Sequence, residues 1–182
     1  MADSNERPVE RQAGLQKVLL GNHCQKEKGE SMTVYLGFDP GAKGAMAILY
    51  DDDSFSIEDF DQMGTDGYAS SLKIIKEMNE PIFAGIEWAT ARPKQGVTSS
   101  FNFGQRFGEI QGLLAGFEIG FTMVRPKKWQ SACGIKPKTG KPGIERAMKK
   151  IYPKADFRGP KGGLKDGRCD AMGVAHYIRM TF

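Results

Sequence analysis

Two acidic residues stand directly after short apolar runs in the first half of the chain. Asp39 follows the run at 34–38, and Glu87 follows the run at 82–86. A carboxylate at the end of a buried strand is costly unless it is paired or binds a cation. If the two runs form neighbouring parallel strands, both acids lie at one edge of a sheet, where ligands collect in such folds.

Two further acids, Asp166 and Asp170, are four residues apart at the start of the last apolar segment. This spacing places them on one face of a helix, although Asp166 taken alone is better explained as a helix cap. Four converging carboxylates without His or Cys form an all-oxygen site suited to Mg²⁺ or Mn²⁺. We therefore predict a catalytic and metal-binding set consisting of Asp39, Glu87, Asp166 and Asp170.

The net charge of +4 conceals an acidic half and a basic half. Residues 32–91 carry a net charge of −8 and residues 92–168 a net charge of +12. A basic half suits phosphate-backbone binding, because each neutralised phosphate releases counterions; lysines that only keep loops soluble are the alternative. The predicted DNA contacts are Arg92, Lys94, Lys127, Lys128, Lys136, Lys138 and Lys141, with Phe101 able to stack on an unpaired base.

The apolar patterns predict an α/β fold with a five-stranded mixed sheet, in which three antiparallel strands precede two parallel ones and helices flank the sheet. Strands are expected at 34–38, 45–50, 54–60, 82–86 and 118–124. Helices are expected at 68–78, 99–116, 144–151 and 167–180. The segment 125–143 is expected to be a lysine-rich loop.

Residues 1–31 show no sustained hydrophobic period, so we expect a disordered or non-native extension before a single domain at 32–182. A genuine flexible arm is the open alternative to a translation start at Met32. Three widely spaced cysteines and two histidines exclude a disulfide framework and a Cys/His zinc site. Without a long apolar run or a signal-type N-terminus, we expect a cytoplasmic protein with no membrane partner.

Three segments resemble the acidic motifs of RuvC-like Holliday junction resolvases, the crossover junction endodeoxyribonucleases. They are GFDPGAKGAMAI at 37–48, AGIEWA at 84–89 and KDGRCDAMGVAHY at 165–177. VRPKKWQSACG at 124–134 is similar to the Pro-x-x-Trp region of phage and bacterial members. The resemblance covers residues 32–180 in order. It implies a ribonuclease H-like fold, a homodimer, Mg²⁺-dependent incision of branched DNA, and a bacterial or phage-infected host cytoplasm.

Carried over residue by residue, the resemblance matches Asp39, Glu87 and Asp170 to the metal-ligand positions and Asp166 to a fourth position. Lys141 is similar in place to a lysine near the scissile phosphate in some members. Gly173 stands where relatives more often have a larger aliphatic residue, and Cys169 where they have Ala. We expect these departures to affect packing rather than chemistry.

Glycines recur every four residues in the helix expected at 99–116, at Gly104, Gly108, Gly112 and Gly116. Each glycine inside a helix costs about 1 kcal/mol relative to alanine, so another backbone is expected to approach this face closely. The partner is either the same helix of a second subunit, which the resemblance favours, or the domain's own sheet. A homodimer would bring two sites to opposing strands of a nearly two-fold junction.

These observations predict a structure-selective endonuclease of DNA recombination and repair. It would resolve Holliday junctions or other branched DNA by hydrolysis with two Mg²⁺ ions per site, and Mn²⁺ would substitute. An actin-like ATPase or sugar kinase needs a second domain and a second phosphate loop, for which 182 residues leave no room. A non-catalytic branched-nucleic-acid-binding scaffold of the same fold is the alternative; it predicts a lost carboxylate, whereas all four are present.

Overall fold

A computed structural model describes residues 32–41, 43–88 and 96–182 of the chain. Its centre is one five-stranded sheet in the order β3-β2-β1-β4-β5. The strands are β1 (Val34–Phe38), β2 (Ala45–Tyr50), β3 (Phe55–Asp59), β4 (Ile82–Glu87) and β5 (Phe121–Val124). β1, β2 and β3 pair antiparallel, whereas β4 runs parallel to β1 and β5 parallel to β4. The predicted mixed sheet is confirmed.

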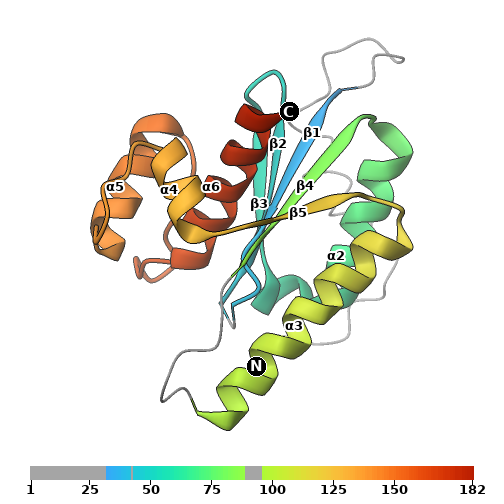
Figure 1. Cartoon of the computed structure of the whole chain (residues 1–182), viewed down its shortest axis with the longest axis horizontal. Helices are drawn as coiled ribbons and strands as arrows, with labels where there is room; N and C mark the ends of the chain where they lie inside the picture. Colours follow the sequence, from blue (N-terminus) through green and yellow to red (C-terminus); the bar gives the residue numbers. More distant parts are fainter. Residues whose placement is uncertain (1–31, 42, 89–95) are drawn as a thin grey trace.

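Helices cover both faces of the sheet (Figure 1). One face carries α2 (Phe60–Met78) and α3 (Val97–Gly116), and the other carries α4 (Pro126–Ala132), α5 (Lys141–Ile151) and α6 (Asp166–Thr181). Because successive side chains of a strand point to opposite faces, β2 contributes to two apolar cores. Met46 and Ile48 pack in the core that contains residues of α2 and α3, and Ala47 and Leu49 in the core of α4 to α6.

Helix α2 begins earlier than its apolar period indicates. α2 starts at Phe60, directly after β3, instead of at residue 68, and the expected strand at 54–60 therefore ends at Asp59. Tertiary contacts explain the early start: the Phe60 N–H donates to the Gly44 carbonyl at 3.0 Å, and the Phe60 ring packs edge-on against Tyr68. Gly64 interrupts the helix in the left-handed region, with φ 63°, which glycine adopts without steric cost.

The expected lysine-rich loop at 125–143 is partly helical. α4 occupies residues 126–132, and α5 begins at Lys141 rather than at residue 144. Proline stands in the first turn of both helices, where its missing N–H costs nothing and its fixed φ suits the helix. α4 carries one large apolar side chain, Trp129, too few for its helical period to be read from the sequence.

The extension at 1–31 and the segment 89–95, which includes Arg92 and Lys94, lie outside the described residues. Within the described ranges, no helix combines the length and apolar character needed to cross a bilayer.

Candidate active site

Asp39 and Glu87 come together at one edge of the sheet, as the sequence predicts. The parallel register pairs Phe38 of β1 with Ile86 of β4, so the next residue on each strand is one of the two acids. Asp39 leaves the sheet and accepts a hydrogen bond from the Gly41 N–H at 2.9 Å. Glu87, the last residue of β4, is buried.

α6 carries the other two acids and lies directly against β1. A Cβ atom on Gly37 of β1 would stand 2.1 Å from the Ala171 carbonyl oxygen of α6. A Cβ atom on Gly167, in the first turn of α6, would stand 2.8 Å from Asp39 Oδ2 and 2.3 Å from the Lys43 carbonyl oxygen. Glycine at these two positions therefore lets the first turn of α6 approach the end of β1.

The four acids act on one another electrostatically. Burial raises the pKa of Asp39 to about 6; the Gly41 N–H opposes the rise, and repulsion from Asp166 adds to it. Burial also raises the pKa of Asp170 well above its ordinary value, and repulsion from Glu87, Asp39 and Asp166 raises it further. The fold thus gathers acids from β1, β4 and α6 into one electrostatic neighbourhood, where burial and neighbouring carboxylates disfavour the ionisation of Asp39 and Asp170.

Protein donors hold two of these carboxylates. The Trp129 indole Nε1–H donates to Glu87 Oε1 at 2.8 Å, and the Lys141 ammonium pairs with Asp166 Oδ2. In the parts of the chain that the structure describes, no group of three or more acidic, histidine or cysteine side chains is arranged to hold a metal ion. The predicted metal ligation therefore stays a prediction.

The donor set nevertheless fits a hard divalent cation. All four groups are carboxylates, the ligand type that Mg²⁺ and Mn²⁺ prefer. Burial and mutual repulsion raise the pKa values of Asp39 and Asp170, and a nearby dication would favour the ionised form of both groups.

The predicted DNA contacts lie on several elements. Lys127 and Lys128 are exposed on α4, and Lys136 and Lys138 are exposed in the connection to α5. Lys141 opens α5, and its pair with Asp166 brings it to the acids. Phe101 of α3 is 69% exposed, so its ring is accessible for stacking. Arg92 and Lys94 are among the residues that the structure does not describe.

Trp129 is the neighbour of the acids that the sequence does not predict. Its ring is fully buried in the core, and the indole also contacts Glu87. A buried indole N–H usually requires an acceptor. This requirement is the feature of the sequence that could have indicated a polar partner for Trp129. Gly173 explains how the ring fits: a Cβ atom there would stand 2.3 Å from Trp129 Cε3. The departure at Gly173 therefore concerns packing, as expected.

The sheet order and the helices on its two faces define a ribonuclease H-like α/β fold. The chain is similar to the RuvC structure of Thermus thermophilus, with 14% identity, a TM-score of 0.53, and coverage of 81% of this chain and 96% of the other. It is similar to the same organism's RuvC in complex with a Holliday junction substrate, with 12% identity, a TM-score of 0.51, and coverage of 83% and 96%.

A third solved structure, the yeast mitochondrial Holliday junction resolvase Ydc2, has 13% identity and a TM-score of 0.47, with coverage of 97% of this chain and 86% of the other. No protein-family model and no curated protein sequence matches the chain. At these identities the two Thermus thermophilus structures establish a shared fold.

Proposed function

We propose that this protein is an endonuclease that cuts branched DNA, resolving Holliday junctions or related forks with the help of divalent cations. The observation that carries the proposal is geometric: Asp39 and Glu87 follow paired residues of the parallel strands β1 and β4, and the start of α6, which bears Asp166 and Asp170, packs against the end of β1. Its support is the fold, which is shared with RuvC structures, one of them bound to a Holliday junction substrate.

Asp39, Glu87, Asp166 and Asp170 are the residues that would hold the ions. Two Mg²⁺ ions, or Mn²⁺ in their place, would supply activation of the attacking water and stabilisation of the leaving oxygen. The chain's own contribution is to fix the acids: β1 and β4 end side by side, and the Trp129 N–H orients Glu87.

The exposed lysines of α4 and of the following segment would contact the DNA backbone. Lys127, Lys128, Lys136 and Lys138 can neutralise phosphates without reading bases. Lys141 pairs with Asp166 in the free protein, and a phosphate at the site offers its ammonium a competing partner. Binding should therefore weaken steeply as salt concentration rises.

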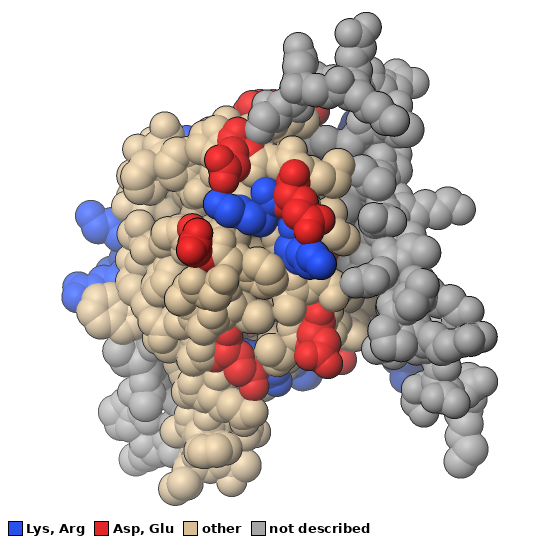
Figure 2. Space-filling model, turned by 90° about the vertical axis from the view of Figure 1, so that its right-hand side faces the viewer, with Lys and Arg blue, Asp and Glu red and all other residues tan. Residues whose placement is uncertain are grey.

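We also propose a homodimer that forms through α3. Among the described residues, no heavy atom would lie within 4 Å of a Cβ atom added at Gly104, Gly108, Gly112 or Gly116. This face therefore does not pack on the domain's own sheet, which contradicts the intrachain alternative. The lower projection of the molecule in Figure 2, which is the beginning of α3, shows no charged side chain. Val97 is exposed on it, which suits an apolar contact with a second copy.

The test compares cleavage of a synthetic four-way junction, a Y-fork and a linear duplex in Mg²⁺ and in EDTA. We expect wild-type protein to cut the branched substrates in Mg²⁺ only. Asp39→Asn should bind the junction and leave it uncut, whereas Asp66→Asn, at an exposed position of α2, should cut at the wild-type rate. Equal cleavage by wild type and Asp39→Asn would remove the site assignment. Junction binding without cleavage in either Mg²⁺ or Mn²⁺ would favour the scaffold alternative.

A further inference from the structure

The start of α6 carries two cations beside the acids Asp166 and Asp170. Lys165 occupies the N-cap position, and Arg168 lies in the first turn. The amino end of a helix dipole is positive, so a cation there typically costs about 0.3–1 kcal/mol. No side-chain hydrogen bond caps this helix. Asp166 lies in the same turn but pairs with Lys141, so Lys165 and Arg168 need another acid as partner.

The partner is Asp59, the last residue of β3. Its position in the register, opposite Ala45 at the start of β2, places it at the sheet edge near the loop that follows Asp39. Asp59 is buried, with 4% of its surface exposed. An acid at this position would be costly if it were unpaired.

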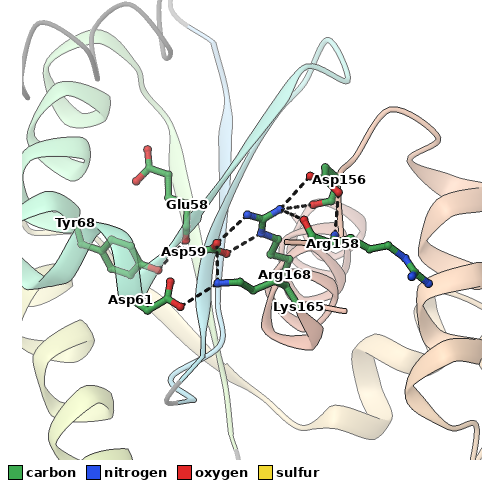
Figure 3. Close-up of polar contacts among 8 residues, drawn as sticks. All are labelled: Glu58, Asp59, Asp61, Tyr68, Asp156, Arg158, Lys165 and Arg168. Carbon is green, nitrogen blue, oxygen red and sulfur yellow. Dashed lines mark hydrogen bonds and ion pairs between the residues drawn. The ribbon is translucent and has the colours of Figure 1, made fainter. Parts of the chain in front are cut away.

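The guanidinium group of Arg168 forms a bidentate salt bridge with the Asp59 carboxylate (Figure 3). Arg168 Nε donates to Asp59 Oδ1 and Nη2 donates to Oδ2, each at 2.7 Å. Lys165 Nζ lies 3.2 Å from Asp59 Oδ2 and donates to Asp61 Oδ2 at 2.9 Å. Burial acts to raise the pKa of Asp59, but hydrogen bonds from Arg168 and Lys165 outweigh it and lower the pKa. Arg168 and Lys165 thus stabilise the ionised form of the Asp59 carboxylate.

The same guanidinium joins a third segment. Arg168 Nη1 donates to the Asp156 carbonyl at 2.9 Å and to the Arg158 carbonyl at 3.0 Å. One side chain therefore connects the end of β3, the connection before α6 and the first turn of α6 itself, as Figure 3 shows. Such a contact restricts movement of this turn along and away from the sheet.

We propose that Arg168 and Asp59, supported by Lys165, form a positioning clamp that holds Asp166 and Asp170 in place against Asp39 and Glu87. Arg168 lies two residues from each of the two acids on α6. The contacts of Arg168 tie the first turn of α6 to the end of β3 and to the connection before α6, so they fix where Asp166 and Asp170 lie. The functional consequence, precise cation binding, rests on the proposed nuclease function. The placement of the first turn of α6 by Arg168 and Asp59 does not depend on that function.

Mn²⁺ binding to the DNA-free protein, measured by titration calorimetry, separates positioning from simple electrostatics. Arg168→Gln removes a cation near the acids, so an electrostatic role predicts tighter binding of Mn²⁺. A positioning role predicts the opposite, about tenfold weaker binding, with partial rescue in Arg168→Lys. The matched control is Arg179→Gln, which breaks the Arg179–Asp53 pair at the other end of α6 and should bind as wild type does. Unchanged or tighter binding by Arg168→Gln would overturn the clamp.

Hydrogen exchange provides a readout that needs neither metal nor cleavage. Backbone amides in the first two turns of α6 should exchange faster in Arg168→Gln and in Asp59→Asn than in wild type. In Arg179→Gln their exchange rates should equal those of wild type. Equal exchange in all four proteins would refute the proposal. If wild-type protein neither binds Mn²⁺ nor cuts a junction, the proposed function fails while the exchange result still decides the clamp. Should Arg168→Gln not fold, Arg168→Lys, which keeps the charge but lacks the fork, carries the comparison.

Discussion

Asp39 is a residue whose environment opposes its own charge. Burial raises its pKa from an ordinary 3.8 to about 6. The folded state therefore binds this proton more tightly than the unfolded chain does. In metal-free protein, the free energy of unfolding should fall as pH rises from about 4 to about 6, by about 3 kcal/mol at most.

Asp39→Asn removes this titration and keeps an oxygen that can accept the Gly41 N–H. We expect the variant to be more stable than wild type at pH 8 in EDTA, and close to wild type at pH 4. Urea denaturation at the two pH values measures the difference, with Asp66→Asn as the control that should show none. A stability gain of the same size at both pH values would contradict the assignment.

Trp129→Phe tests the indole that contacts Glu87. Phenylalanine keeps most of the ring in the core but lacks the N–H that donates to Glu87 Oε1. We expect cleavage about 10- to 100-fold slower and a stability loss of about 1–3 kcal/mol.

The control for Trp129→Phe is Tyr152→Phe, which removes another hydrogen-bonding group of the core, the hydroxyl that shares a 2.7 Å hydrogen bond with His176 Nδ1. This variant should also lose stability but should cut at the wild-type rate. If both variants slow cleavage equally, the effect of Trp129 is general destabilisation rather than orientation of Glu87.

At the scale of elements, the fit between β1 and α6 controls how closely the acids can approach. Gly37→Ala would place a methyl group 2.1 Å from the Ala171 carbonyl oxygen, so β1 and α6 must separate. Overpacking of this kind costs about 1–3 kcal/mol, and we expect the melting temperature and the affinity for Mn²⁺ to fall together.

A glycine-to-alanine substitution in α3 provides the contrast with Gly37→Ala. A methyl group added at Gly112 meets no described atom within 4 Å. Gly112→Ala should therefore stabilise the isolated subunit by about 1 kcal/mol, the difference in helix propensity. Thermal unfolding at low protein concentration measures both variants; destabilisation of similar size in both would mean that the β1–α6 contact is not the special one.

At the scale of the whole molecule, the acids lie at an edge of the sheet and the glycine face of α3 lies on the surface. Gly108→Gln adds a neutral side chain to that face without a clash inside the subunit. We expect the variant to sediment as a folded monomer and to nick one strand of a junction at a time. Gly163→Gln, at another open glycine, is the control and should remain dimeric. A wild-type chain that sediments as a monomer while bound to a junction would refute the dimer.

Local pattern predicted the parts of the fold whose burial is uniform along the chain. β1 and β2 begin and end where their apolar runs do, since strands buried on both faces are continuously apolar. The start of α2 was missed because its first turns precede its apolar period, and α4 was missed because it has no apolar period of its own. The Phe60 N–H is hydrogen-bonded to the Gly44 carbonyl, and α4 is anchored in the core by the buried indole of Trp129.

The sequence by itself predicted the strands of a mixed sheet, the acids that end two of them and the acids of the last helix, because strand and helix positions follow from local periodicity and turn residues. Only the tertiary structure decided that Trp129 contacts Glu87, 42 residues away, and that Arg168 grips Asp59, 109 residues away. It also decided that the glycine face of α3 is open. Contacts of this kind form between side chains that packing brings together, and they leave no period in the sequence between them.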